Sequence, residues 1–102
     1  MDPISSKAAL LQALIQEEGY GLELIDRVKE RTGGKLVLGQ GTIYPALREM
    51  EKEGLVKSYE RDPLPERGGR PRRYYKITGL GRRAGQEDVR IVAALFGVPV
   101  PT

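Results

Sequence analysis

The chain has 102 residues, of which 39% are hydrophobic and 30% are charged, and this length and balance fit one small domain with a single core. It contains no cysteine and no histidine, which excludes zinc sites of the usual type, thiol nucleophiles and histidine-based acid–base catalysis, and no cofactor is expected. The net charge is only +3, but residues 57–83 carry 9 basic and 3 acidic side chains, a local concentration that favours a polyanionic partner.

Composition also bears on location. No apolar run approaches the roughly 18 residues of a membrane-spanning helix, so no membrane partner is expected. Residues 1–6 have neither the basic region nor the apolar region of a secretory signal, and cysteine is absent. The sequence therefore predicts a cytoplasmic protein.

The first two predicted elements are helices. Ser5 or Ser6 is suited to cap a helix that ends near Gln16, because apolar residues recur at helical spacing between them. Gly19–Gly21 is expected to be a turn. A second helix is predicted from Gly21 to about Arg31, with a buried stripe formed by Leu22, Ile25 and Val28.

A short β-prone segment precedes the third predicted helix. Lys35–Leu38 has the composition of a strand, and Gln40 to Thr42 offer capping side chains after Gly39. Pro45 is expected in the first turn of this helix, where its missing N–H removes no hydrogen bond. Gly54 is expected to end the helix, whose buried stripe is predicted to be Ile43, Ala46, Leu47 and Met50.

The second half of the chain predicts a hairpin and a last helix. Leu55–Arg61 and Arg72–Ile77 have the pattern of paired strands, joined by the Pro-, Gly- and Arg-rich loop 62–71. Thr78 is suited to cap a helix that ends at Phe96. The predicted fold is mostly α-helical with a small β-hairpin, in the order of a winged helix-turn-helix followed by a C-terminal helix.

The start of the third helix is the segment that enters the major groove in helix-turn-helix proteins. Small residues there let the helix end approach a phosphate closely, and hydroxyl groups add hydrogen-bond donors. The alternative is that Gly41 and Thr42 only cap the helix and that Tyr44 only packs. The candidate DNA contacts are Gln40, Gly41, Thr42, Tyr44, Pro45 and Arg48.

The wing is the second candidate DNA contact. Four arginines, at positions 67, 70, 72 and 73, cluster around glycines and a proline, and guanidinium groups bind phosphates and narrow minor grooves well. The alternative is an ordinary solvated loop. Strand spacing predicts that the rings of Tyr74 and Tyr75 lie on opposite faces, so at least one belongs to the core. Tyr20 is expected either to contact a phosphate or to pack. The arginine candidates are Arg67, Arg70, Arg72 and Arg73.

The last helix carries more apolar surface than one small winged domain can cover, and such a surface favours an interface. Two copies paired through it would be related by a two-fold axis and would bind a pseudo-palindromic DNA site. The alternative is that the helix folds back on its own core. Residues 1–78 are expected to form the DNA-binding domain, 79–97 a dimerisation helix and 98–102 a flexible tail. The interface candidates are Leu80, Ala84, Ile91, Val92, Leu95 and Phe96.

Three blocks of this sequence resemble the PadR family of bacterial regulators. They are Gly19–Gly21, Gly41–Leu47 leading into Leu55 and Val56, and Gly69–Thr78. The resemblance covers residues 7–85, in the order and spacing of the family. It implies a transcriptional repressor that dimerises through its C-terminal helix, with Thr42 and Tyr44 near the DNA backbone and the arginine wing beside them.

The resemblance also implies a small aromatic or lipophilic effector that releases DNA, although effectors vary widely among family members. The chain departs from the longer members because it lacks a multi-helix domain after Phe96. That departure places a dedicated ligand pocket in doubt and leaves a cleft between two subunits as the alternative.

Other functions remain alternatives at this point. Winged helices also bind acidic proteins, but small and hydroxyl residues at a recognition-helix start, together with four wing arginines, favour nucleic acid. An RNA-binding winged helix is a weaker alternative. An enzyme using the Glu49 and Glu53 pair is disfavoured, since carboxylates four residues apart on a helix are typical of a solvated flank.

Overall fold

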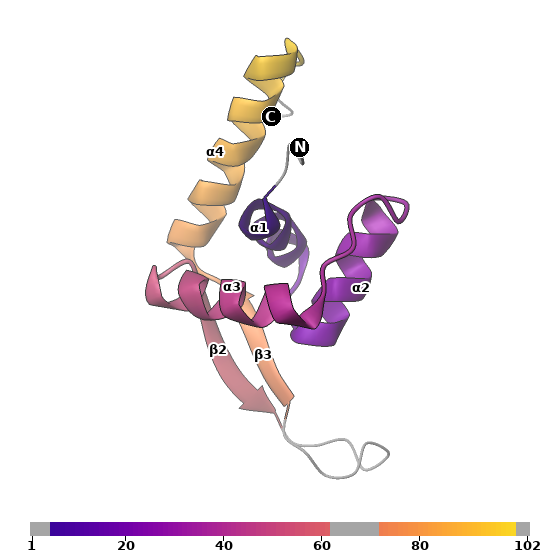
Figure 1. The fold of residues 1–102 in the computed structure, drawn as a ribbon. Coiled ribbons are helices and arrows are strands. Elements are labelled where there is room, and N and C mark those ends of the chain that lie inside the picture. Colours follow the sequence, from indigo (N-terminus) through magenta and orange to yellow (C-terminus); the bar gives the residue numbers. More distant parts are fainter. Residues whose placement is uncertain (1–4, 62–71, 100–102) are drawn as a thin grey trace.

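The computed structural model describes residues 5–61 and 72–99, which form four helices and three strands (Figure 1). The predicted fold class is confirmed: a winged helix-turn-helix with an additional C-terminal helix. The helices are α1 (Ser6–Gln16), α2 (Gly21–Arg31), α3 (Gln40–Lys52) and α4 (Gly79–Phe96), and the strands are β1 (Gly19–Tyr20), β2 (Val56–Arg61) and β3 (Arg72–Ile77).

The sheet has one strand more than the predicted hairpin. Its order is β1-β3-β2 with antiparallel pairing, and Gly19 and Tyr20 lie opposite Tyr75 and Tyr74. The prediction of a simple turn at Gly19–Gly21 is therefore wrong, because two of these residues complete the sheet. The predicted strand at Lys35–Leu38 is also wrong: the segment is irregular, and its apolar character serves to bury Leu38 in the core.

The core lies where α1, α2 and α3 meet β3. Leu10, Leu24, Ile43 and Leu47 are fully buried there, and burial of each such side chain stabilises the fold by about 1.5–3 kcal/mol. The predicted stripe of α3 is confirmed at Ile43, Leu47 and Met50, with Ala46 packed against the core.

The predicted stripe of α2 is wrong at one position. Leu22 is 40% exposed, whereas Leu24 is completely buried. Both leucines fit a helical period with Val28, and the difference arises because α1 and α3 pack against the face that carries Gly21, Leu24 and Val28. The direction of that face depends on tertiary packing, which periodicity alone does not specify.

The predicted helix ends are largely as expected. Ser5 Oγ accepts a hydrogen bond from the Ala8 N–H at 3.0 Å, and Thr78 Oγ1 accepts one from Gly81 at 3.0 Å. Gly54 and Gly97 follow the last turns of α3 and α4 with φ of 79° and 68°, a conformation that disfavours side chains. The placement of Pro45 in the first turn is wrong. Since α3 begins at Gln40, Pro45 lies in its second turn and cannot donate to the Gly41 carbonyl.

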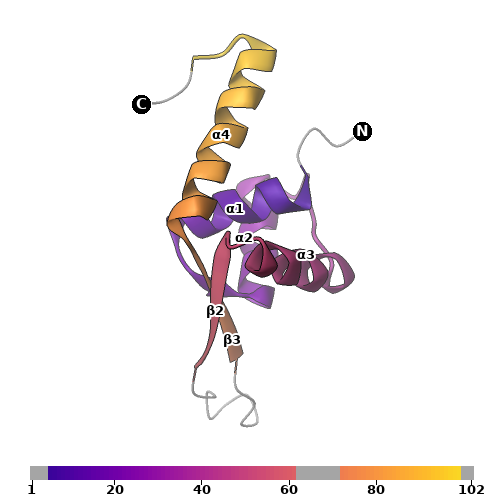
Figure 2. The ribbon, with the colours of Figure 1, turned by 90° about the vertical axis from the view of Figure 1, so that its left-hand side faces the viewer.

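The hairpin of β2 and β3 and the far end of α4 extend on opposite sides of the other helices (Figures 1 and 2). The first turns of α4 lie close to the domain because Gly81 and Gly85 carry no side chain, and Gln12 Nε2 donates to the Gly85 carbonyl at 2.7 Å. Within residues 5–61 and 72–99, no helix is long and apolar enough to cross a membrane.

Candidate nucleic-acid interface

The start of α3 presents one open face. Gln40, Gly41, Thr42, Pro45 and Arg48 are exposed, and Tyr44 is 37% exposed, while Ile43 and Leu47 of the same helix point into the core. Gly39, not Gln40 or Thr42, occupies the capping position, so the predicted side-chain caps are wrong. Among the described residues no side chain accepts a hydrogen bond from the first N–H groups of α3. The Thr42 N–H donates instead to the Gly39 carbonyl at 3.1 Å, whereas the N–H groups of Gln40 and Gly41 have no acceptor within the described chain, and a phosphate suits such a helix N-terminus.

Tyr44 both packs and faces outward. Its ring lies against Gly21 at the start of α2, so closely that a methyl group at Gly21 would lie 2.5 Å from Tyr44 Cε1 and 2.6 Å from its hydroxyl oxygen. Nearby, burial raises the pKa of the Tyr75 phenol above its ordinary value, an effect that the positive charge of Arg73 partly opposes. Tyr75 therefore stays neutral at physiological pH as part of the core.

The two faces of the wing strands differ. On one face the ring of Tyr74 stacks on Tyr59, with centroids 5.8 Å apart, and meets Tyr20 edge-on at 5.4 Å. The Arg61 guanidinium lies 4.5 Å from the Tyr74 centroid, and that of Arg72 lies 4.7 Å from the Tyr20 centroid. These arginines are held over aromatic rings by cation–π attraction. Tyr74 is thus buried by its neighbours and offers no free ring for stacking on a base.

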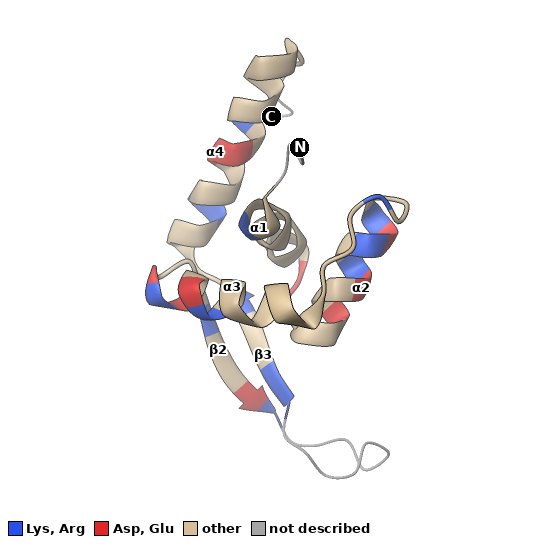
Figure 3. Cartoon of the chain, in the orientation of Figure 1, with Lys and Arg blue, Asp and Glu red and all other residues tan. Residues whose placement is uncertain are grey.

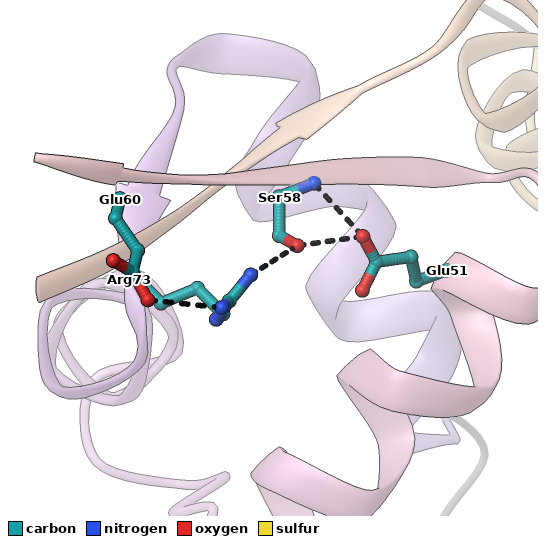
Figure 4. Close-up of polar contacts among 4 residues, drawn as sticks. All are labelled: Glu51, Ser58, Glu60 and Arg73. Carbon is teal, nitrogen blue, oxygen red and sulfur yellow. Dashed lines mark hydrogen bonds and ion pairs between the residues drawn. The ribbon is translucent and has the colours of Figure 1, made fainter.

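The other face carries a chain of polar contacts (Figure 4). Arg73 donates to Ser58 Oγ at 2.9 Å and pairs with Glu60 at 3.2 Å. Ser58 donates in turn to Glu51 Oε2 on α3, through its hydroxyl at 2.6 Å and its N–H at 3.1 Å. The recognition helix and the wing are linked by this chain, and Arg73 is oriented by it while remaining half-exposed.

The predicted wing arginines divide into two groups. Arg72 and Arg73 lie at the base of the wing on opposite faces of β3, Arg72 partly buried and Arg73 exposed. Arg67 and Arg70 lie outside the described residues. Lys and Arg residues lie on both strands of the hairpin, together with Glu60 on β2, whereas the last turns of α4 carry no charge (Figure 3).

The far half of α4 is apolar and exposed. Leu95 is 76% exposed, Phe96 64% and Ile91 58%, and Val92 is also exposed; Leu80 is exposed too, but it lies in the first turn of α4. Ala84 differs from the other interface candidates, since it packs against the core of its own chain. An open groove of about 990 Å³ lies beside this half of α4 and is bordered by α1, by residues 36–38 and by Thr42 at the start of α3.

The described residues hold no group of acidic side chains suited to a metal ion. Glu53, one of the two carboxylates of the disfavoured enzyme alternative, forms an exposed ion pair with Lys7 at 2.9 Å. Such a contact contributes at most about 1 kcal/mol and is typical of a helix flank.

Several residues at this face were not predicted from the sequence. Tyr59 and Arg61 in β2, and the link between Glu51 and Ser58, become evident only from the pairing of β2 with β3. That register places Tyr59 opposite Tyr74 and Arg61 opposite Arg72. Alternation along each strand could have indicated which residues share a face. The register between the two strands could not be derived from the sequence, because a long loop joins them.

The fold and this face define a winged helix-turn-helix protein with a basic hairpin. The model of the PadR-like family of transcriptional regulators matches residues 10–87, and the chain belongs to that family. Family membership makes it a transcriptional regulator and not an enzyme.

Individual relatives agree with this assignment. The chain is 42% identical over 55 residues to the transcriptional regulator Rv3488 of Mycobacterium tuberculosis, covering 54% of this chain and 48% of that protein. A PadR-like transcription factor from Bacteroides fragilis superposes with a TM-score of 0.75 at 26% identity, covering 89% of this chain and 82% of that one.

The structure of Bacillus subtilis PadR, solved in complex with operator DNA, superposes with a TM-score of 0.70. It is 22% identical and covers 79% of this chain and 44% of that one. This likeness is one of fold.

Proposed function

We propose that the chain is a transcriptional repressor that binds duplex DNA sequence-specifically as a homodimer. The observation that carries the proposal is the open first turn of α3, which has small and hydroxyl residues, no side-chain cap within the described chain, and a buried opposite face. Bacillus subtilis PadR, which has the same fold, was solved in complex with operator DNA, and that supports the same use here.

The residues have different roles in this proposal. The hydroxyl groups of Thr42 and Tyr44, with the N–H groups of Gln40 and Gly41, bind phosphates, and Pro45 and Gly41 allow close approach. Gln40 and Arg48 reach base edges, since Gln and Arg match adenine and guanine respectively. The four wing arginines, Arg67, Arg70, Arg72 and Arg73, contact the backbone or the adjacent minor groove. Arg73 would exchange Glu60 for a phosphate.

The proposed dimer forms through the far half of α4. Leu95 and Phe96 are more than 60% exposed, and no charged residue follows Arg90. Covering such a surface with a second copy removes apolar area from water, and a two-fold axis would pair the recognition helices on a pseudo-palindromic operator. Residues 1–78 then act as the DNA-binding unit and 79–97 as the dimerisation helix, in a cytoplasmic protein.

A small apolar effector is the remaining part of the proposal. The groove beside α4 is lined by Val89, Val92 and Phe96 and extends to Thr42 at the start of α3. A lipophilic compound bound there would contact both the proposed interface and the proposed DNA contact, which supports release of DNA on binding.

Fluorescence anisotropy tests the DNA-binding proposal. The protein is titrated onto the duplex upstream of its own gene and onto a scrambled duplex, each at two salt concentrations. We expect salt-sensitive binding that prefers the upstream duplex, with affinity reduced in Arg48→Ala and unchanged in the control Lys29→Ala, at an exposed position in the last turn of α2. No binding to either duplex at low salt would contradict the proposal and favour an acidic protein partner; preference for RNA over duplex DNA would contradict it as well.

A further inference from the structure

The Gly19–Gly21 segment lies between the two proposed DNA contacts. Gly19 and Tyr20 pair with Tyr75 and Tyr74 of β3, so the segment belongs to the sheet that bears the wing. Gly21 is the first residue of α2 and is buried against Tyr44 of α3. One segment of three residues thus contacts the wing on one side and the recognition helix on the other.

Arg27 of α2 holds the backbone that leads into this segment. Its guanidinium donates to the carbonyl oxygens of Ala13, Glu17 and Glu18, at 2.9, 2.6 and 3.3 Å, and so ties the end of α1 to α2. The Tyr20 N–H also donates to Glu23 Oε1 at 3.3 Å. These bonds restrict the backbone on both sides of the segment.

Gly21 determines where the Tyr44 ring lies. Three atoms of the Tyr44 side chain come within 2.7 Å of the point where a Cβ at Gly21 would stand. Real carbon atoms do not approach this closely, so any larger residue would displace the ring. The clash would involve the phenol end of Tyr44, which is the part proposed to contact DNA, because the hydroxyl oxygen is one of the three atoms.

Tyr20 determines where Arg72 lies. Its ring is half-buried, meets Tyr74 edge-on and carries the Arg72 guanidinium 4.7 Å from its centroid. The ring face of Tyr20 is therefore occupied by an arginine of its own chain. Removing the Tyr20 ring would leave Arg72 only the more distant ring of Tyr74, at 5.7 Å, whereas removing only the hydroxyl would keep both contacts.

We propose that Gly19–Gly21 is a positioning segment that holds Tyr44 of the recognition helix and Arg72 of the wing at a fixed separation, matched to phosphates of one duplex. Tyr20 then acts through Arg72 and not by direct contact with DNA. This inference rests on the proposed DNA binding, and it assigns a function to two glycines and a ring that themselves touch no phosphate.

A double-mutant cycle on DNA affinity tests Gly21. Gly21→Ala should weaken binding of the upstream duplex about tenfold, the size expected for loss of a hydrogen bond to a charged group. In a Tyr44→Ala background the same change should have no further effect, because nothing is left to displace. Gly79→Ala is the matched control, since Gly79 is also the first residue of a helix and a Cβ there meets only Arg83 Nη1, at 3.6 Å.

The second cycle tests Tyr20. Tyr20→Phe should bind DNA as the wild type does, while Tyr20→Leu should bind more weakly. In Tyr20→Leu the slope of log affinity against log salt concentration should also decrease by the amount expected for the loss of about one phosphate contact. In an Arg72→Ala background, Tyr20→Leu should cause no further loss of DNA affinity. Equal losses in Tyr20→Phe and Tyr20→Leu would overturn the inference and show direct contact by the hydroxyl.

The two failures can be distinguished. If wild-type protein binds no duplex, the proposed function itself is wrong. If the wild type binds but the effects of Gly21→Ala and Tyr44→Ala simply add, DNA binding stands and the positioning role is wrong. Thermal unfolding of every variant separates these results from loss of fold.

Discussion

The two halves of α4 differ in what they contact. In the first half Gly81 and Gly85 bring the helix backbone against Leu55 and α1, and Thr78 caps it with its hydroxyl. In the second half Ile91, Leu95 and Phe96 are more than half exposed. The same helix is closely packed at one end, whereas at the other end Ala93 is buried and the larger apolar side chains are exposed.

This difference shows how one helix can connect two surfaces. Because the first half has little freedom, the direction of the second half is set by the winged domain. Any partner bound to the second half would then be held at a fixed angle to the recognition helix. For a homodimer, that angle would set the separation of two operator half-sites.

The largest expected effect concerns the second half. Leu95→Glu combined with Phe96→Glu should convert the proposed dimer to a monomer, because two charges would have to be buried in an apolar interface. Light scattering should give the 11.3 kDa mass of one chain, with an unchanged circular dichroism spectrum since both side chains are exposed. Leu22→Glu, at an exposed leucine of α2, is the control; a double variant that stays dimeric would place the interface elsewhere.

Gly81→Ala should have the largest effect in the first half. A Cβ there would collide with the Leu55 carbonyl oxygen and lie 2.8 Å from Ile77 Cγ1. Backbone cannot move aside easily, so we expect a loss of about 2 kcal/mol in the free energy of unfolding, or roughly 10 °C in Tm. Calorimetry measures it, and an unchanged Tm would mean that α4 is not held at Leu55.

Thr78→Ala should have an intermediate effect. The change removes the cap of α4 and the hydrogen bond from the Thr78 hydroxyl to the Gly54 carbonyl at 2.6 Å. We expect a loss of about 1 kcal/mol in urea unfolding. Thr78→Ser keeps the hydroxyl and should restore most of the stability; if serine is as poor as alanine, packing of the methyl group and not capping is responsible.

Gly85→Ala should have the smallest effect, although it also creates a close contact. The obstacle is Ile15 Cδ1 at 2.7 Å, the flexible end of a side chain. Its movement should be offset by the gain in helix propensity of about 1 kcal/mol. We expect a Tm within a few degrees of the wild type, and a loss as large as that of Gly81→Ala would show that α1 is as rigid there as the Leu55 backbone.

Local signals in the sequence predicted much of this fold. Ser5, Thr78 and Gly54 mark helix ends through their residue types, so they could be recognised without the tertiary structure. The two wing strands were also evident from alternation. The exposed start of α3 followed once the order of elements was known.

Features that depend on distant partners were not predicted. β1 has only two residues, too few for an alternating pattern, and its partner in β3 lies more than fifty residues away. Leu38 lies in a loop and its side chain fills part of the core. The β propensity of its segment therefore reflected burial and led to the wrong prediction of a strand. The contact of Gly21 with Tyr44 depends on how α2 crosses α3, which no local pattern encodes.

The number of chains on one DNA duplex tests the account most directly. Sedimentation of the protein with a labelled duplex, chosen as the one bound most tightly by anisotropy, measures it. We predict two chains per duplex for the wild type and much weaker binding for the Leu95→Glu, Phe96→Glu variant. One chain per duplex, with equal affinity for both proteins, would contradict the proposal that α4 forms the dimer that binds DNA.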